Sequence, residues 1–221
     1  MRVTQLVRAM KPESSYSPVE IQAEHERLGH KLGWRLFTCP VQDIETASVA
    51  LITINPGGSK FEEPRWSVEA DSAYEIESWK GRPPGQENLQ RQVRRMFEIM
   101  AVKPKEVLSG YLVPFRSSTW NALEKKQASK DFGMAIWRDI LDRLKPRTVI
   151  AFGKDIADDV ASLLDARDCK KYSAGWGEQT IDTFLYGTGG KLIILPHLSR
   201  FSLFNRPQSE AAFLSAALDS F

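Results

Sequence analysis

The sequence predicts an α/β protein with three layers, in which helices cover both faces of a central four-stranded parallel sheet. Two observations lead to this fold class. Four short apolar runs, rich in β-branched residues, have the composition of strands that are buried on both faces. The long segments between them carry apolar residues at three-and-four spacing, which indicates helical crossovers between parallel strands. The four runs are residues 49–54, 110–115, 148–152 and 191–195.

The chain length favours a single domain. With 221 residues, 42% of them hydrophobic, the chain can bury one large core. We therefore expect one domain over residues 1–221, with an N-terminal helical extension before the sheet. The formal net charge of +2 neither requires nor opposes a nucleic-acid partner, since a local patch matters more than the total.

Helix signals flank the predicted strands. Ser17-Pro18-Val19-Glu20 is a capping box with proline at the first helical position, and it predicts a helix that runs to about Lys31. Apolar periodicity predicts four later helices, one after each strand in the chain. They cover residues 89–100, 134–144, 156–164 and 210–218.

Two segments interrupt this alternation. Residues 62–85 place Trp66, Tyr74 and Trp79 among acids and prolines, which predicts a loop, and its position after the first strand suits a lid over a site. Residues 172–186 contain Gly175 and Gly177, are followed by Gly187-Thr188-Gly189-Gly190, and predict a hairpin or an irregular excursion rather than another helix.

Polar residues follow each predicted strand. The first strand stops at Asn55, before a Pro-Gly-Gly turn, and the second leads into Arg116 and several hydroxyl residues. The third ends at Gly153-Lys154 and the fourth delivers His197. Because the carboxyl ends of parallel strands meet at one edge of a sheet, we expect these side chains to lie at the same edge.

Asn55 and His197 are the candidate catalytic residues. A neutral imidazole can donate a hydrogen bond to a developing anion, and a carboxamide can hold both a water molecule and a substrate. Neither group is a strong base. The pair therefore suits stabilisation of a leaving anion better than abstraction of a proton.

No metal or cofactor is expected. His25 and His30 are five residues apart and do not share the helix face of a metal-binding pair. Cys39 and Cys169 lack the CxxC spacing of zinc and iron–sulfur sites, so both are predicted to be reduced, buried thiols. Residues 1–10 have no apolar core of signal-peptide length and no later segment resembles a membrane span, so we expect a cytoplasmic protein.

Three motifs at the strand ends resemble those of the uracil-DNA glycosylase superfamily, particularly its mismatch-directed and single-strand-selective branches. Ile54-Asn55-Pro56-Gly57 is similar to the first family motif, and Pro196-His197-Leu198-Ser199 is similar to the second. Residues 149–153 resemble the family's third strand and turn. The similarity covers four strand ends between about residues 49 and 204.

The resemblance implies a monomeric enzyme that acts on DNA without a metal or an organic cofactor. Such an enzyme flips the target nucleotide into a pocket and hydrolyses its N-glycosidic bond. Carried over, Asn55 would orient the water and His197 would stabilise the departing base. Phe61 or Trp66 would stack on that base, and the other pocket residues would be Ile54, Pro56, Gly57, Tyr111 and Phe115.

The resemblance also implies a DNA-binding surface around the same edge. Leu198 and Phe201 fall where the family inserts an apolar wedge into DNA, beside Arg200 as a phosphate ligand. The remaining candidates for DNA contact are Ser59, Arg116, Lys154 and Ser199. An alternative interpretation makes Phe201 a core anchor for the last helix.

The chain departs from the family pattern at three positions. Thr53 replaces the glycine before the first motif, Tyr111 replaces an asparagine that reads uracil, and Leu198 replaces a proline. A phenol cannot present the paired donor and acceptor of an amide. The target base, uracil or another damaged base, therefore stays open.

Two other functions remain possible from the sequence. The chain could be a non-catalytic relative that binds a base, a nucleotide or a protein partner in the same pocket. It could also be a nucleoside or nucleotide hydrolase in which Arg116 and His197 hold a phosphate. The carboxylates that crowd residues 62–77 would repel a DNA backbone unless they face away from it.

Overall fold

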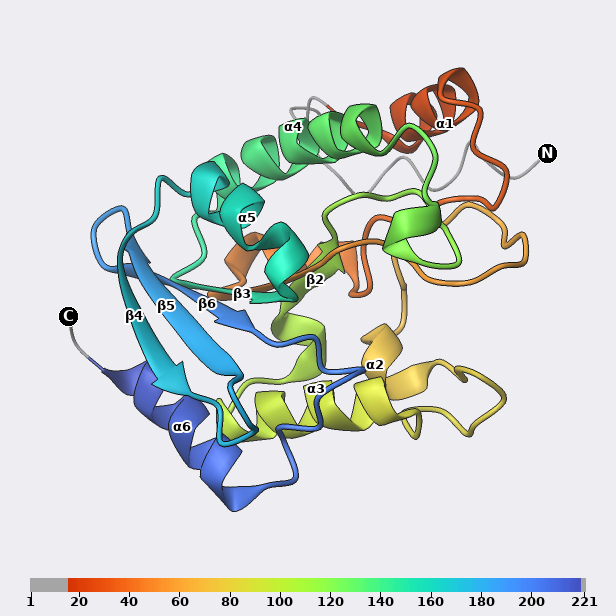
Figure 1. Cartoon of the computed structure of the whole chain (residues 1–221). Coiled ribbons are helices and arrows are strands. Elements are labelled where there is room, and N and C mark those ends of the chain that lie inside the picture. Colours follow the sequence, from red (N-terminus) through yellow and green to blue (C-terminus); the bar gives the residue numbers. More distant parts are fainter. Residues whose placement is uncertain (1–15, 220–221) are drawn as a thin grey trace.

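The computed structural model describes residues 16–219, which form a six-stranded mixed sheet between two layers of helices (Figure 1). The strand order is β2-β1-β3-β6-β5-β4. Its parallel part consists of β1 (Val49–Thr53), β2 (Leu108–Tyr111), β3 (Thr148–Phe152) and β6 (Gly190–Leu195). β5 (Thr180–Tyr186) pairs antiparallel with β6, and β4 (Arg167–Ser173) pairs antiparallel with β5.

The α/β class is confirmed, but the prediction of a four-stranded, all-parallel sheet is wrong. The four predicted strands form the parallel part, and the hairpin of β4 and β5 extends it at one edge. The hairpin predicted at residues 172–186, as an alternative to an irregular excursion, is confirmed, but β4 begins earlier, at Arg167. The early part of β4 was missed because this solvent-exposed edge strand, Arg-Asp-Cys-Lys-Lys-Tyr-Ser, has no apolar run. Charged residues, especially lysine, are typical of edge strands because they discourage pairing with another chain.

The second strand was also misplaced, since it covers residues 108–111 and not 110–115. Its fully buried Ser109 interrupts the apolar pattern that located the other strands. The Ser109 hydroxyl accepts a hydrogen bond from Thr38 at 2.7 Å, which makes its burial acceptable.

Each face of the sheet is covered by three helices (Figure 1). On one face lie α1 (Pro18–Arg27), α4 (Lys126–Leu144) and α5 (Ala157–Leu163), and on the other lie α2 (Ala73–Ile76), α3 (Asn88–Ile99) and α6 (Pro207–Leu218). Each face packs a hydrophobic core, which we call the first core on the side of α1, α4 and α5 and the second core on the side of α2, α3 and α6. Alternate residues of β1 point to opposite cores, with Ile52 in the first and Leu51 in the second. Residues 16–219 also contain the short 3₁₀ helices η2 (Val41–Thr46), η3 (Pro104–Glu106), η4 (Trp120–Ala122) and η5 (Lys154–Ile156).

The helix ends follow their local signals. The capping box at α1 is present, with the Ser17 amide donating to Glu20 at 2.6 Å. The helix stops at Arg27, before the predicted Lys31, since Gly29 takes a left-handed φ of 78°. α4 begins at Lys126 and not at residue 134, because its first two turns are mostly polar and carry little periodicity.

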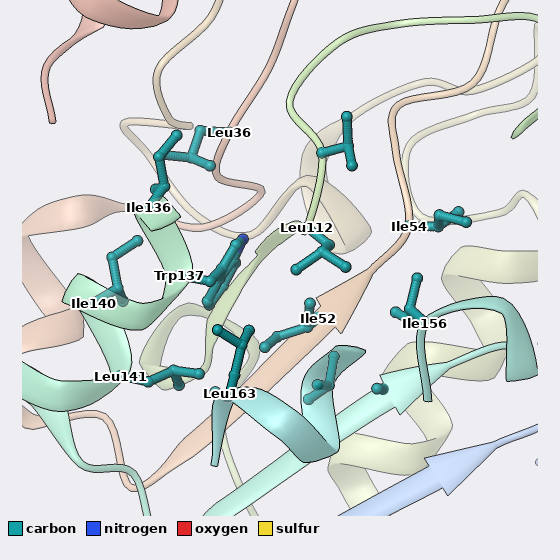
Figure 2. Close-up of a cluster of buried hydrophobic side chains, with 14 of the residues drawn as sticks. Leu36, Ile52, Ile54, Leu112, Ile136, Trp137, Ile140, Leu141, Ile156 and Leu163 are labelled. Carbon is teal, nitrogen blue, oxygen red and sulfur yellow. The ribbon is translucent and has the colours of Figure 1, made fainter. Parts of the chain in front are cut away.

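Helix α4 fixes the end of β2. Figure 2 shows Trp137 and Leu141 of α4 gathered with Ile52 of β1 in the first core. The Trp137 indole donates to the Tyr111 carbonyl at 2.7 Å. A Cβ atom on Gly133 would lie 2.0 Å from the Leu112 carbonyl oxygen, so only glycine permits this close approach. The packing therefore sets where the chain leaves the sheet toward Arg116.

The two cysteines differ in exposure. Cys39 is a buried free thiol as predicted, and burial raises its pKa to about 11. Cys169 is exposed on β4, so the prediction that it is buried is wrong. Within residues 16–219, no helix has the length and apolar character needed to cross a bilayer. The segment 1–10, on which the prediction of localisation partly rests, lies outside the described residues.

Candidate functional site

The four predicted strand ends lie along one edge of the parallel sheet. In the order of the strands, this edge carries Arg116 after β2, Asn55 after β1, Gly153 after β3 and His197 after β6. Neighbouring strands are about 4.8 Å apart, so the chains at Asn55 and His197, two strands apart, are separated by about 10 Å. Gly153 lies between them without a side chain. A Cβ atom there would be 3.6 Å from the His197 ring.

The Asn55 side chain is held by the segment that follows β2. Its amide nitrogen donates to the Ser117 hydroxyl at 2.8 Å and to the Phe115 carbonyl at 3.2 Å. A carbonyl can only accept, so these contacts place the nitrogen toward β2 and turn Oδ1 away from it. Oδ1 has no hydrogen-bond partner within residues 16–219 and is not among the buried unpaired atoms there. It is a free, solvent-accessible acceptor.

The His197 ring is held through its Nδ1 atom. The Ser199 backbone amide donates to Nδ1 at 3.3 Å, and the Ser199 hydroxyl lies 2.8 Å from the same atom. Since the amide can only donate, Nδ1 accepts, and a neutral ring carries its proton on Nε2. Burial, followed by the nearby charge of Arg200, lowers the pKa of His197, while Asp155 opposes the shift. At neutral pH, His197 therefore offers an Nε2–H donor.

The Pro-Gly-Gly turn is bound to the β2 side of the site. The Gly58 amide donates to the Ser117 carbonyl at 3.1 Å. Gly58 has a φ of 132°, and a Cβ atom on it would lie 2.6 Å from the Arg116 guanidinium. That guanidinium donates to the Gly57 carbonyl and pairs with Glu62. Arg116 is thus an internal brace between two loops, with only 9% of its side chain exposed, and is not a free phosphate ligand.

Several predicted pocket and DNA-binding residues lie in the interior. Leu198 is fully buried in the second core, so in this structure it does not form an exposed wedge. Phe115 is fully buried and stacks on Phe132. Trp66 packs edge-to-face on Phe37, with ring centroids 5.2 Å apart, which is a structural contact. Ile54 and Pro56 are buried beside Asn55.

The other predicted residues reach solvent to different degrees. Phe61 is 57% exposed, and Gly57, Ser59, Ser199 and Arg200 are also exposed. Phe201 is half-buried. Lys154 is exposed, but its ammonium group pairs with Asp182 and contacts the Thr180 hydroxyl at 3.2 Å. It therefore ties the end of β3 to β5.

Two residues that differ from the glycosylase motif pattern, Thr53 and Tyr111, lie side by side in the sheet. Thr53 and Tyr111 are register partners on β1 and β2. The Thr53 hydroxyl donates to the Gly110 carbonyl at 3.3 Å, inside the sheet. Burial raises the pKa of Tyr111, against the opposing effect of Arg35, so its phenol is un-ionised at neutral pH.

Sequence reasoning missed an ion pair that anchors the segment over this edge. The buried Arg35 guanidinium donates to both carboxylate oxygens of Glu77, at 2.8 and 2.9 Å. Arg65 and the Trp79 indole also donate to Glu77. Burial alone would raise the pKa of Glu77, but the bonds from Arg35 bring it below the ordinary value. No motif links Arg35 to Glu77, so no sequence signal was available.

No protein-family model matches the sequence, and no curated protein matches it. What the site can do must therefore be judged from its geometry. It combines the Asn55 Oδ1 acceptor with the His197 Nε2–H donor, neither of which has a hydrogen-bond partner within residues 16–219, on either side of a glycine at the end of β3. Within residues 16–219 there is no group of three potential metal-ligating side chains.

Proposed function

We propose that this protein is a DNA glycosylase, which flips uracil or another damaged base out of DNA and hydrolyses its N-glycosidic bond. The observation that carries the proposal is the polarity of the site, in which Asn55 presents an acceptor and His197 a donor at one sheet edge. Hydrolysis of this bond needs both functions. The motif resemblance at the same strand ends supports the same reaction.

In the proposed mechanism, Asn55 Oδ1 accepts a hydrogen bond from a water molecule. The water oxygen is thereby directed at the sugar carbon that carries the base. The bond between this carbon and the base nitrogen breaks, and a bond to the water oxygen forms. The water gives up a proton to solvent. The base departs with the electron pair and is protonated after it leaves.

His197 stabilises the departing base. Its Nε2–H donates to a carbonyl oxygen of the base, on which negative charge develops as the bond breaks. The lowered pKa of His197 fits this function, because a neutral imidazole retains the Nε2 proton through the reaction. Loss of one such donor typically lowers kcat by about 100-fold to 1,000-fold.

Tyr111 bears on the choice of base. We place the flipped base beside the Thr53–Tyr111 pair, where a phenol offers its donor and acceptor on a single oxygen and cannot match the paired groups of an amide. A base that is recognised mainly by its shape and by stacking fits beside Tyr111 better than uracil recognised through paired hydrogen bonds. A panel of deaminated and alkylated bases is therefore part of the test.

The experiment is base release from a labelled oligonucleotide that contains a single uracil, without added metal. We expect wild-type activity, and we expect Asn55→Ala and His197→Ala each to lower kcat by about 100-fold or more. Ser118→Ala is the matched control, since Ser118 is exposed next to the site. Wild-type rates in both site variants would refute the mechanism.

The other two functions have less support. A phosphate-binding hydrolase needs an available Arg116, whose guanidinium is already bound to Glu62 and the Gly57 carbonyl. A non-catalytic relative would bind DNA tightly but release no base from any member of the panel. The same experiment detects that outcome.

A further inference from the structure

A shallow depression lies next to the His197 loop, on the part of the sheet that the β4–β5 hairpin adds. Its volume is about 580 Å³, and it is lined by Trp176, Gly177, Ser202, Asn205 and Arg206. The first two belong to the turn between β4 and β5, and the others precede α6. Ser202 follows His197 by five residues, so the two lie within about 17 Å of each other.

The loop after β6 turns tightly toward this depression. The amides of Arg200 and Phe201 both donate to the His197 carbonyl, at 2.8 and 3.1 Å. Phe201 then meets Trp176 edge-to-face, with ring centroids 6.2 Å apart. The segment that carries the proposed catalytic histidine is therefore in direct contact with the hairpin tip.

The lining combines an aromatic ring with a cation. The Arg206 guanidinium carbon lies 4.3 Å from the centroid of the Trp176 ring, and both side chains are half-buried. Asn205 and Ser202 add uncharged donors, and none of the five described residues that line the depression carries a carboxylate. Aromatic rings and arginine planes stack on nucleobases, and arginine also binds phosphate.

We propose that this surface, which we call the Trp176 platform, binds a nucleotide of the DNA strand beside the flipped one. Its base stacks on the Trp176–Arg206 pair, and its phosphate accepts hydrogen bonds from Arg206 and Asn205. The inference rests on the proposed function, because it assigns the platform to the same DNA strand. Stacking of this kind tolerates any base, so the platform increases affinity without reading sequence.

The test measures binding apart from catalysis. A fluorescently labelled, single-stranded oligonucleotide of thymidines, which offers no damaged base, is titrated with protein and followed by anisotropy. We expect Trp176→Ala to raise the Kd about tenfold or more, and Trp176→Phe to keep most of the affinity by retaining a ring.

Charge is tested separately with Arg206→Ala. We expect weaker binding and a shallower dependence of log Kd on log salt concentration, since one phosphate contact is lost. Lys103→Ala is the matched control: it removes one positive charge from the residue before η3, ahead of β2 at the opposite edge of the sheet. We expect it to leave the Kd within about twofold of wild type.

The outcomes separate the two proposals. Equal Kd values for wild type and Trp176→Ala, or no binding by wild type, would overturn the platform. Trp176-dependent binding without base release from any oligonucleotide would keep the platform and refute the glycosylase. Base release that is unaffected by Trp176→Ala at subsaturating DNA, together with an unchanged Kd, would keep the glycosylase alone.

Discussion

Ser117 makes the shortest hydrogen bond to the amide nitrogen of Asn55, at 2.8 Å, and replacing it tests the proposed geometry directly. In Ser117→Ala, the amide nitrogen of Asn55 loses its 2.8 Å bond and retains two longer ones, at 3.2 Å to the Phe115 carbonyl and at 3.4 Å to the Pro56 carbonyl. The Thr119 carbonyl loses the Ser117 hydroxyl, which donates to it at 2.8 Å. Two neutral hydrogen bonds, each contributing about 0.5–1.5 kcal/mol, lower the free energy of unfolding by about 1–3 kcal/mol.

The effect on activity has a different signature. Without the Ser117 hydroxyl, the carboxamide of Asn55 rotates more freely, and a smaller fraction of molecules presents Oδ1 to the water. A loss of about 1.4 kcal/mol in the orienting energy corresponds to about a tenfold lower kcat. KM should change little, because the water and not the DNA depends on this atom.

The assay is single-turnover and steady-state base release by Ser117→Ala, Ser117→Thr and Ser118→Ala, with urea unfolding of each. Threonine retains the hydroxyl and should recover most of kcat. Ser118 is exposed, and its replacement should change neither measurement. A kcat for Ser117→Ala equal to that of wild type, in a protein that shows the expected loss of stability, would refute the orientation argument.

Two further predictions concern stability. Glu77→Gln leaves the buried Arg35 guanidinium without its counter-charge and should lower the free energy of unfolding by about 3–5 kcal/mol, measured by urea denaturation against the exposed Glu63→Gln. Burial lowers the pKa of all three histidines, so the unfolded chain binds more protons at acid pH. Their contribution should be complete above about pH 6.5 and fall as the pH decreases, by about 1.4 kcal/mol per unit of lowered pKa. Neither ring nitrogen of His25 has a partner within residues 16–219, so His25→Leu should flatten the dependence of stability on pH. An unchanged dependence would contradict the assignment of this loss of stability to the buried histidines.

The sequence located the parallel strands because their burial leaves a direct trace in composition. Val49–Thr53 and Thr148–Phe152 are covered on both faces, so every position favours an apolar residue. β4 leaves no such trace, since its outer edge and most of its side chains meet water. β2 leaves a partial one, because Ser109 is buried through a hydrogen bond that no local pattern records.

The same distinction applies to the site. Topology alone brings Asn55 and His197 to one edge, because the ends of parallel strands must meet there. The path of the loops is not set by topology, and it decides what each polar group contacts. Arg116 was predicted to bind phosphate, but Glu62 follows a glycine-rich turn that brings its carboxylate to the guanidinium. Leu198 was predicted to enter DNA, but the turn at His197 directs it into the second core.

The two candidate catalytic groups are held through opposite hydrogen-bonding functions, and this determines which group can accept and which can donate a hydrogen bond in the site. Asn55 is held through its donor, which leaves an acceptor free, and His197 is held through its acceptor, which leaves a donor free. An acceptor suits a water molecule that must release a proton, and a donor suits a base that leaves as an anion. The opposite arrangement would place a donor toward the attacking water and an acceptor toward the developing negative charge, and so would oppose the reaction at both ends. In the proposed mechanism, the contacts of Ser117 and Ser199, which touch no substrate, therefore orient the strand-end pair for hydrolysis.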